Sequence, residues 1–580
     1  MELGLVGSGP ASAALSAACS DIDLPVRRLD SADLPADPTA RREHEQPTVP
    51  SVGAVVAPVG AGVFRAANRL FSRWVAVEIG GLGGFAFENI DAGVSLYTSE
   101  SACYRCLETR VAAQTDDSSS VSPSGSRPAV RLAGAIAGNQ LVSLLSGSLD
   151  GGRVTEVPGA DRRLSPVPHC ECSDGDRPDT AFELTHRSVS TDTSLTRAER
   201  AIDDRLGLIS QVGERESFPV PYYIAETADT TGFSDGRAAQ FAAGVDPDWD
   251  RSYMKALGEA LERYSAGIYR TRDLDAGSVH TKSDAVSPRA FVRPDDFETP
   301  DPSDRITWVT GRSLADGDTV SLPAEFVFFP PPNRRYRPAI TTGLGLGNST
   351  VEAVLSGLYE VIERDATMLG WYSTFEPLGL VVDDALDELT KRAGAESLTV
   401  TTLLLTQDID IPVVAAAVHR DGAWPRFAVG SAANLDPTAA AQSALAEALQ
   451  NWMELRAMGP EQAAEQGGAI AQYASFPAAA RAFVTPTGRI HSQTLEEQAV
   501  QGKRELDTVC ERLSAVGLSA YAARLTPRDV ADLGFEAVRV VIPAAQPLFT
   551  GDPFFGSRAR EVPRSMGFEP QLDRDYHPFP

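Results

Sequence analysis

The chain has 580 residues, of which 43% are hydrophobic and 23% charged, and these values exclude wholesale disorder and a single small domain. Its 79 acidic and 52 basic residues give a net charge of −27, which argues against a nucleic-acid or anionic-membrane surface, since either needs clustered positive charge. An acidic surface that is poor in lysine is also typical of proteins from salt-loving microbes, and the four lysines are Lys255, Lys282, Lys391 and Lys503. Without a run of about 18 apolar residues or a basic secretion signal, we expect a cytoplasmic protein with no membrane contact.

The N-terminal residues predict the start of an α/β domain. An apolar run at residues 3–6 is followed by the glycine turn of residues 7–12 and an alanine-rich helical stretch. This order fits a nucleotide-binding turn, and it fits equally a tight turn that binds nothing. Residues 52–57 (VGAVVA) predict a second buried strand.

Two polar stretches interrupt the apolar pattern. Residues 115–127 have no apolar periodicity, so we expect a mobile loop there. Residues 173–193 are again polar and contain proline, which makes them the best candidate for a domain junction. Beyond residue 194, long helical stretches alternate with valine-rich strands. The expected fold class is therefore α/β (α+β), with an N-terminal domain over residues 1–190 and one large domain over residues 191–580.

Four of the six cysteines form two close pairs, which is the spacing of a metal site. The pairs are Cys103/Cys106 and Cys170/Cys172. Four thiolates close a tetrahedral zinc shell and leave no position for water, so such a zinc would be structural. Redox chemistry by Cys103 and Cys106 is an alternative interpretation, and four ordinary free thiols are another.

Two predicted helices each carry a pair of glutamates three residues apart. The pairs are Glu259/Glu262 and Glu360/Glu363, each followed by an arginine, and a weaker third copy contains Glu447. Residues three apart share one helix face, so each pair brings two carboxylates together, and solvent, arginine or a metal ion has to offset their repulsion. Salt-bridged solvent-exposed helices are the alternative.

The second acidic helix extends this pattern toward its N-terminus. Glu352 lies about 20° from Glu363 around a straight helix, but about 12 Å from Glu360 along the axis, too far to ligate one ion. Several hard cations along a polyphosphate suit this stripe, because Mg²⁺ prefers carboxylate and phosphate oxygens. Three glycines at 343, 345 and 347 predict a phosphate-binding loop before the helix, although Ser349 and Glu352 also match a capping box. No lysine has a P-loop context, so any ATP site is of another kind.

These acidic motifs resemble the YcaO family over residues 194–580. The residues that carry the resemblance are ALGEALERY at 256–264 and GLGLGN at 343–348 continuing to YEVIERDA at 359–366. In that family, these segments form an ATP site without a P-loop. The final residues HPFP (577–580) are similar to the azoline-forming branch, in which a proline-rich tail places the terminal carboxylate in the active site; a frayed chain end is the alternative.

The resemblance also extends to the N-terminal part, which is similar to the E1-like domain of many cyclodehydratases, where paired cysteines hold structural zinc. It implies roles for three groups of residues. Glu259, Glu262, Glu352, Glu360 and Glu363 would hold Mg²⁺. Pro580 would supply the catalytic carboxylate. Contacts with ATP would come from Arg263, Asn348, Arg364, Gln450 and Lys255, the last of which stands where the family usually has serine and would replace a lysine missing upstream.

The resemblance therefore implies an ATP-dependent cyclodehydratase that converts Cys, Ser or Thr of a ribosomal precursor peptide to thiazoline or oxazoline. A thioamide- or amidine-forming YcaO enzyme and a non-catalytic peptide-binding scaffold are the alternatives. The expected partners are the precursor peptide and a second copy in a homodimer, and a separate leader-binding protein and a flavin dehydrogenase are further candidates. Because the first predicted strand begins at residue 3, we expect no leader-binding module before it, which puts leader recognition by this chain alone in doubt.

Overall fold

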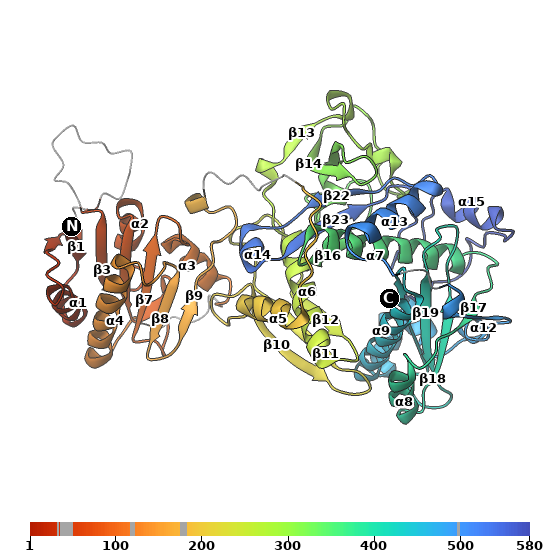
Figure 1. Ribbon diagram of the computed structural model, residues 1–580, viewed down its shortest axis with the longest axis horizontal. Helices are drawn as coiled ribbons and strands as arrows, with labels where there is room; N and C mark the ends of the chain where they lie inside the picture. Colours follow the sequence, from red (N-terminus) through yellow and green to blue (C-terminus); the bar gives the residue numbers. More distant parts are fainter. Residues whose placement is uncertain (32–33, 35–49, 116–121, 174–181, 496–498, 580) are drawn as a thin grey trace. The chain divides into compact units, whose positions relative to one another are not determined.

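The computed structural model describes residues 1–31, 34, 50–115, 122–173, 182–495 and 499–579 (Figure 1). The chain divides into two compact units. The smaller one comprises residues 1–178, 200–211 and 228–234, and the larger one comprises residues 179–199, 212–227 and 235–580. Both units combine helices with β-sheets, which confirms the predicted mixed α/β class. Among the described residues, no helix is both long and apolar enough to cross a membrane.

The smaller unit is built on a seven-stranded sheet in the order β2-β1-β3-β4-β7-β8-β9. Its parallel strands are β1 (Leu3–Val6), β2 (Val26–Leu29), β3 (Val52–Pro58) and β4 (Arg73–Ile79). Its antiparallel strands are β7 (Ala92–Thr98), β8 (Arg153–Val157) and β9 (Asp161–Arg163). The strands predicted at residues 3–6 and 52–57 are thereby confirmed.

Helices cover both faces of this sheet. Val75 and Val77 of β4 belong to the core that contains α1 (Pro10–Ser20) and α4 (Arg127–Leu145). Because neighbouring strand residues point to opposite faces, Trp74 lies on the other side, where it packs against Tyr104 of α3 (Tyr104–Ala112). Helix α2 (Val63–Leu70) contributes Phe64 to the same aromatic cluster. Both faces are buried, as parallel strands require.

The predicted polar stretches fall partly outside the described residues. Residues 116–121 of the expected loop are not described, and the end of that stretch, Arg127, begins α4. Residues 174–181 of the expected junction are not described either. On its far side, helix α5 (Thr191–Ala198) begins after Ser190, whose side chain accepts a hydrogen bond from the Thr193 N–H.

The described residues of the larger unit form three sheets and three long helices. One sheet has the order β10-β11-β12, with β10 at Ile209–Glu216, β11 at Tyr222–Thr227 and β12 at Phe241–Val245. Another has the order β13-β14-β22-β23-β16, and β15 is added to β14. The strands of this sheet are β13 (Asp275–Gly277), β14 (Ile306–Ser313), β22 (Tyr521–Arg524), β23 (Glu536–Val541), β16 (Leu344–Gly347) and β15 (Thr319–Pro323). The last sheet has the order β20-β19-β18-β17-β21. Its strands are β20 (Phe427–Ala433), β19 (Val413–His419), β18 (Thr399–Leu404), β17 (Leu378–Val381) and β21 (Arg489–His491).

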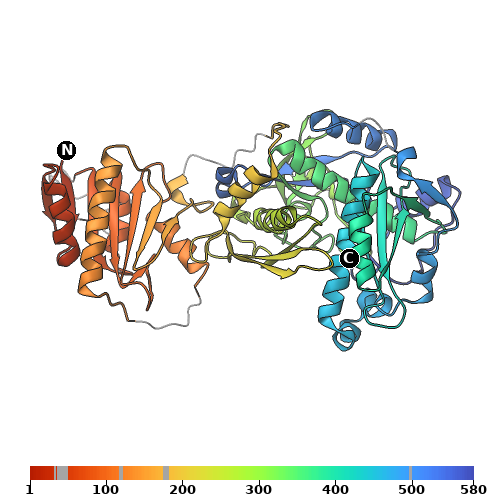
Figure 2. The same cartoon turned by 60° about the horizontal axis from the view of Figure 1, so that its bottom comes forward.

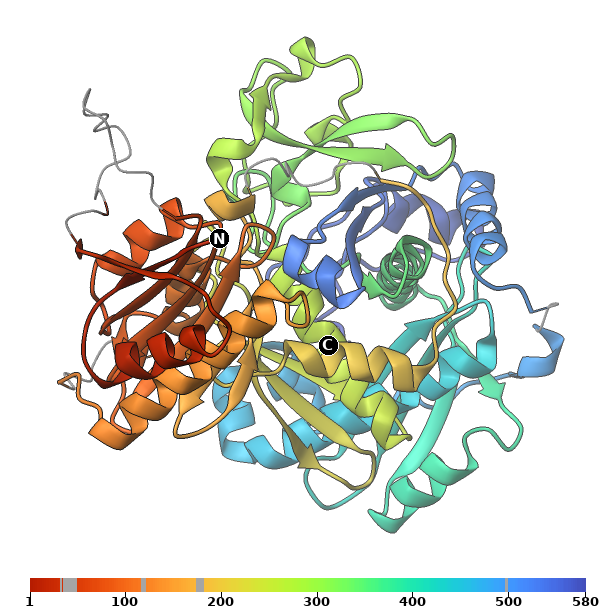
Figure 3. The ribbon, with the colours of Figure 1, turned by 60° about the vertical axis from the view of Figure 1, so that its left-hand side comes forward.

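Each long helix packs against a different set of strands. Helix α6 (Trp249–Ala266) lies against β11 and β12, which Figure 2 shows in yellow. Helix α7 (Thr350–Trp371) lies between the sheet that contains β16 and β23 and the sheet that contains β19 and β20; Figure 3 shows this helix almost end-on. Helix α9 (Pro437–Met458) packs on β19 and β20. Three segments far apart in the sequence are thus assembled within one unit.

The remaining helices of the larger unit surround this framework. α8 spans Asp387–Ala395 and packs on β18, and α13 spans Lys503–Ala515 and packs on α7. The shorter helices are α10 (Pro460–Gln466), α11 (Gly468–Tyr473), α12 (Ala478–Phe483), α14 (Arg528–Leu533) and α15 (Arg558–Ser565).

Candidate functional site

The three predicted acidic segments are helices, and each begins with a side-chain cap. Asp248 caps α6, Ser349 caps α7 and Asp436 caps α9, each by accepting a hydrogen bond from a backbone N–H in the first turn. A cavity of about 600 Å³ in the larger unit is lined by residues from all three helices. Its acidic lining residues are Glu259, Glu262, Glu352 and Glu447.

Each acidic helix approaches its strand closely because the strand carries a glycine. A Cβ atom on Gly244 of β12 would lie 2.1 Å from the Ala256 nitrogen, and one on Gly345 of β16 would lie 2.1 Å from the Ala353 oxygen. On Gly430 of β20, it would lie 2.5 Å from atoms of α9. Any larger residue would therefore push the helix away from its strand.

This close packing lets backbone N–H groups in or beside the strands hold the carboxylates. The Ala243 N–H donates to Glu259 Oε2 at 3.1 Å, and the Gly343 N–H donates to Glu360 Oε2 at 2.9 Å. Likewise, the Ser431 N–H donates to Glu447 Oε2 at 2.8 Å. Three glutamates from three helices are thus fixed in the same way, each by one backbone donor.

The predicted glycine loop is wrong, because residues 344–347 form strand β16, which pairs antiparallel with β23. Its glycines serve the contact with α7 described above. Gly343, just before the strand, has a φ of +90°, which favours glycine, and its N–H is used by Glu360. The backbone N–H groups here therefore bind a carboxylate.

Glu352 has two roles. The Ser349 hydroxyl accepts a hydrogen bond from the Glu352 N–H at 3.4 Å, and the Glu352 carboxylate accepts one from the Asn348 N–H at 3.0 Å. The serine half of the predicted capping box is therefore formed, whereas the Glu352 carboxylate binds the N–H of Asn348 and not that of Ser349; Glu352 also lines the cavity. Asn348 lines it too, and Ser194 holds its side chain by donating to Oδ1 at 3.0 Å.

Two carboxylates meet at Ser431. Glu363 Oε1 accepts a hydrogen bond from the Ser431 hydroxyl at 2.6 Å, while Glu447 binds the N–H of the same residue. Burial raises the pKa of Glu363 to about 8, although the charge of Arg364 opposes this, and Glu447 raises it further by repulsion. Burial likewise raises the pKa of Glu447.

Glu360 interacts with the other acids of the three helices. Burial raises the pKa of Glu262 to about 8, against the charge of Arg263, and repulsion from Glu360 adds to the increase. The charge of Glu360 also contributes to the raised pKa values of Glu259, Glu363 and Glu447, in each case after burial. The carboxylates of the three helices therefore form one interacting cluster.

Arginines offset part of this negative charge. Arg263 donates to Glu259 at 3.0 Å, and Arg364 lies 3.5 Å from Glu363. A third arginine, Arg539 of β23, is buried, and its guanidinium donates to the carbonyls of Thr341 and Ile340 at 2.7 and 2.9 Å. Burial lowers the pKa of Arg539 to about 10, while the negative charges of Glu360 and Glu262 favour its charged form. Five interacting carboxylates, those of Glu259, Glu262, Glu360, Glu363 and Glu447, therefore lie among three arginines.

This excess of carboxylate oxygen beside the cavity fits divalent cations. Oxygen ligands are those that Mg²⁺ prefers, and a cation would relieve the repulsion that raises the pKa values of Glu262 and Glu363. The cavity above the cluster has the size of a small-molecule site. The residues present thus fit a metal-bound anionic ligand.

The structure brings most of the other predicted site residues to the same cavity. Lys255 and Gln450 both line it. Lys255 Nζ lies 2.7 Å from Asp246 Oδ2 and donates to the Val245 carbonyl at 3.1 Å, so its charge is already paired. Gln450 donates to Glu454 at 3.0 Å. Glu360, Glu363, Arg263 and Arg364 are not among the lining residues. Arg263 pairs with Glu259 and Arg364 with Glu363, while Glu360 binds the Gly343 N–H.

Two side chains near the end of the C-terminal tail are buried, although their neighbour Tyr576 is 41% exposed. His577 and Phe579 are each 3% exposed, and the rings of Phe579 and Trp371 meet edge to face. His577 Nε2 donates to the Phe549 carbonyl at 2.5 Å. Burial, helped by the charge of Arg364, lowers the pKa of His577 to about 4. Pro580, the predicted catalytic residue, lies outside the described residues.

The sequence interpretation misses three residues of this cluster. Glu447 occurs only in the weaker copy of the motif. It could have been found from its spacing of three residues to Gln450 on an apolar helix. Arg539 and Ser431 carry no such signal, because only the pairing of their strands brings them to the acidic helices.

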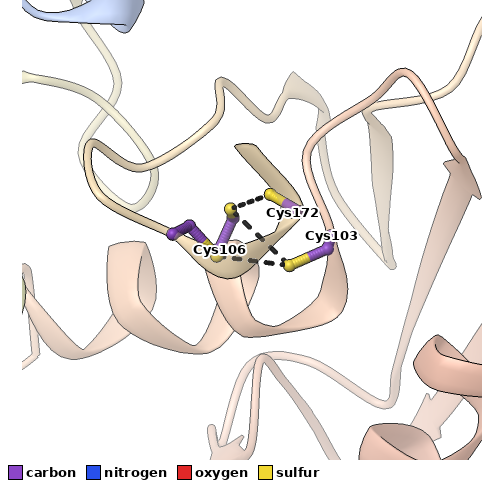
Figure 4. Close-up of side chains that lie close together, drawn as sticks. Cys103, Cys106 and Cys172 are labelled. Carbon is purple, nitrogen blue, oxygen red and sulfur yellow. Dashed lines mark hydrogen bonds between the residues drawn. The ribbon is translucent and has the colours of Figure 1, made fainter. Parts of the chain in front are cut away.

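The cysteine pairs of the smaller unit meet at one point (Figure 4). Their sulfur atoms all lie within 4.8 Å of one another. Cys103 is 3.8 Å from Cys106 and 3.6 Å from Cys170, and Cys106 is 3.6 Å from Cys172. Four thiolates at the zinc–sulfur distance of about 2.3 Å would lie about 3.8 Å apart.

The surroundings of these sulfurs also suit zinc. The Val167 N–H donates to Cys106 Sγ at 3.3 Å, a hydrogen bond that stabilises a thiolate. Hydrogen bonds from Cys103 and Cys106 lower the pKa of Cys170 to about 7, whereas hydrogen bonds among the sulfurs and burial raise the pKa of Cys106. The sulfurs are too far apart for disulfides, and the cluster is compatible with a closed tetrahedral zinc site.

Residues 243–546, just over half of the chain, match the family model described as YcaO cyclodehydratase, ATP- and Mg²⁺-binding. An uncharacterized protein of Methanothermobacter thermautotrophicus is 29% identical to this chain over 384 residues, which are 61% of this chain and 94% of that protein. The matched region contains all three acidic helices.

Two solved structures share the fold over almost the whole chain. One, described as a heterocyclase in complex with substrate and cofactor, has a TM-score of 0.75 at 18% identity and covers 99% of this chain and 84% of that one. The heterocyclase TruD has a TM-score of 0.66 at 18% identity and covers 98% of this chain and 82% of its own. The similarity therefore includes the N-terminal unit as well as the acidic helices.

Proposed function

The chain belongs to the YcaO family, and from this membership and the acidic cavity we propose that it is an ATP-dependent cyclodehydratase acting on a ribosomal precursor peptide. The convergence of carboxylates from α6, α7 and α9 on one cavity is the observation that supports this proposal most strongly. We assign residues 1–190 to an E1-like domain and residues 191–580 to the YcaO domain.

In the proposed reaction, the side chain of Cys, Ser or Thr attacks the preceding amide carbonyl. ATP phosphorylates the resulting oxyanion, and departure of phosphate leaves a thiazoline or oxazoline. The net change removes the elements of one water from the peptide, and the amide oxygen ends up in the phosphate. The protein mainly orients the reactants and neutralises charge, as is usual in phosphoryl transfer.

The residues that line the cavity and those of the adjoining acidic cluster divide this work. Glu259, Glu262, Glu352, Glu360, Glu363 and Glu447 would hold Mg²⁺, which when bound shields the phosphate charges. Arg263, Arg364, Asn348, Gln450 and Lys255 would orient ATP. Because Asp246 already pairs with Lys255, contact of Lys255 with a phosphate would require the lysine to leave that carboxylate.

The end of the chain would handle the proton. We propose that the carboxylate of Pro580 accepts the proton of the attacking group, because Phe579, its neighbour, is buried against the end of α7 and the charge of Arg364 reaches His577. A rigid proline-containing tail would hold such a carboxylate at a low entropic cost.

Zinc in the cysteine cluster would be structural. It would join α3 to the segment around Cys170 and take no part in the reaction. The precursor peptide is the proposed substrate. A separate leader-binding protein, a flavin dehydrogenase, a homodimer and a cytoplasmic location remain part of the same proposal.

Mass spectrometry of an isotope-labelled peptide tests the reaction. A candidate precursor peptide with ¹⁸O in the carbonyl before its Cys, Ser or Thr is incubated with the protein, ATP and Mg²⁺. We expect the peptide mass to fall by the mass of one labelled water per ring, with the ¹⁸O recovered in the released phosphate and not in water. Replacement of the oxygen by sulfur would indicate thioamide formation, and ATP binding without any change of peptide mass would indicate a scaffold; either result contradicts the proposal.

A further inference from the structure

A buried ion pair joins α7 to the C-terminal part of the chain. Asp365, on α7 two residues after Glu363, is 1% exposed. Its Oδ1 accepts hydrogen bonds from Arg558 Nε at 3.0 Å and from the Gln546 N–H at 2.7 Å. Its Oδ2 accepts one from Arg558 Nη2 at 2.7 Å. This carboxylate therefore holds two points of the C-terminal segment, one on each side of residues 547–557.

Arg558 binds a second carboxylate in the same manner. Its Nη1 and Nη2 donate to Asp408, in the turn after β18, at 3.0 and 2.8 Å. One guanidinium thus bonds two aspartates with four hydrogen bonds in all. A buried ion pair adds little net stability compared with a well-packed apolar pair, but it does require one specific geometry. It is therefore suited to fixing a position.

Gln546 makes the intervening loop rigid. Its side chain donates to the carbonyls of Pro547 and Phe554, each at 3.0 Å, and accepts a hydrogen bond from the Gly556 N–H at 2.8 Å. Gln546 is itself 1% exposed. The loop that leads to α15 is thus closed by hydrogen bonds at its base, directly beside Asp365.

Beyond α15, the tail returns to the same helix. The Gln571 N–H donates to the Tyr372 carbonyl and Arg574 Nη1 to the Trp371 carbonyl, each at 2.8 Å. Arg574 also lies over the Trp371 ring, 3.9 Å from its centroid. These contacts lie about 9 Å along α7 from Asp365, on the axial rise of a helix.

We propose that Asp365 and Arg558 are positioning residues that set where residues 543–579 lie along α7. The same 22-residue helix carries Glu352, Glu360 and Glu363 in its earlier turns and receives the tail at its C-terminal end. The ion pair therefore fixes the distance between the acidic cluster and the last residues of the chain. The effect on turnover rests on the proposed function, whereas the docking of the tail does not.

Three variants of the full-length protein test this role. Arg558→Met leaves both aspartates without their partner. Asp365→Asn removes one charge but keeps the shape, and Arg558→Lys keeps the charge but loses the paired hydrogen bonds. Arg564→Met, an exposed position on the same helix, is the matched control. If Arg558→Met does not fold, Asp365→Asn and Arg558→Lys decide the question.

Hydrogen–deuterium exchange tests the docking, and kinetics with Mg-ATP titration test its consequence. In Arg558→Met and Asp365→Asn, we expect amides of residues 566–579 to exchange at least tenfold faster, with α9 unchanged. We expect kcat to fall at least tenfold while the Kd for Mg-ATP changes less than threefold, with Arg558→Lys intermediate and the control like wild type.

Three results would overturn the inference: unchanged exchange in the tail, faster exchange throughout α7 and α9, or faster tail exchange with unchanged kcat. The first shows that the pair does not hold the tail, and the second shows a purely structural role. The third shows that tail position does not matter to turnover. If wild-type protein turns over no peptide, the proposed function fails, and the exchange measurement alone decides whether the pair docks the tail.

Discussion

Glu447 and Glu363 are joined through one serine, although their helices are far apart in the sequence. Ser431 donates its hydroxyl to Glu363 and its N–H to Glu447. The pKa values of both carboxylates are raised, first by burial and then by their neighbours. We therefore regard Glu447 as part of the same cation-binding cluster.

Replacing Glu447 by glutamine tests this assignment. Glutamine can still accept the Ser431 N–H, so the fold should be retained, but one buried negative charge is lost. We expect the affinity for Mg-ATP, measured by isothermal titration, to fall by about tenfold to a hundredfold. Glu461→Gln, an exposed position on α10, should bind like wild type. Wild-type affinity in Glu447→Gln would remove this residue from the site.

At the residue scale, the spacing of the glutamates predicts most of the cluster but not its geometry. Glu259, Glu262, Glu360 and Glu363 can be found because residues three apart share a helix face. The sequence does not predict which helices face one another, because this depends on the pairing of β16 with β23 and of β19 with β20. Arg539 is brought to Glu360 by that pairing alone.

At the scale of elements, the glycine pattern predicts a loop, whereas the segment is a strand. Alternating glycines at 343, 345 and 347 leave one face of β16 without side chains, and α7 packs there. The same arrangement at Gly244 and Gly430 escapes sequence analysis because a single glycine in an apolar strand has no periodicity. Close approach of the helix backbone, rather than turn formation, explains the glycines at 244, 345 and 430.

The cysteine cluster depends on two short elements, the first turn of α3 and the turn around Cys170. We expect elemental analysis to find about one zinc per chain, and we expect Cys106→Ser to lose it and to lower the thermal stability of the smaller unit. Cys510→Ser, outside the cluster, should keep the metal. Zinc-free wild-type protein with normal stability would contradict the assignment.

We expect mild acid to lower the free energy of unfolding, because it protonates His577 of the docked tail. The pKa of His577 is lowered to about 4 by burial, whereas it is about 6.5 in an unfolded chain. Between these values only the unfolded chain binds the proton, so the stability that His577 contributes is complete above pH 6.5 and is lost as the pH falls toward 4. By pH 5 the loss amounts to about 2 kcal/mol.

Urea unfolding at pH 7 and pH 5 measures this effect. Wild type should lose about 2 kcal/mol more than His577→Gln between the two pH values, because the glutamine cannot titrate. His491→Gln, at an exposed position, should behave like wild type. An equal loss in wild type and His577→Gln would show that the buried histidine does not control the tail.

At the scale of the whole molecule, the chain has a net charge of −27 and only four lysines. Self-repulsion of this charge destabilises the folded state at low ionic strength, and salt screens it, since the Debye length falls from about 10 Å at 0.1 M to about 3 Å at 1 M. We expect the thermal unfolding midpoint to rise by several degrees between 0.1 and 2 M KCl. A flat or falling midpoint would contradict the salt-adapted interpretation of the sequence.

The central claim is that carboxylates from three helices of one unit bind ATP through divalent cations. Titration of wild-type protein with ATP, in excess Mg²⁺ and again in excess chelator, tests it most directly. We predict one ATP site per chain in the presence of Mg²⁺, and at least a hundredfold weaker binding in chelator. No binding with Mg²⁺, or equal binding without it, would contradict the account.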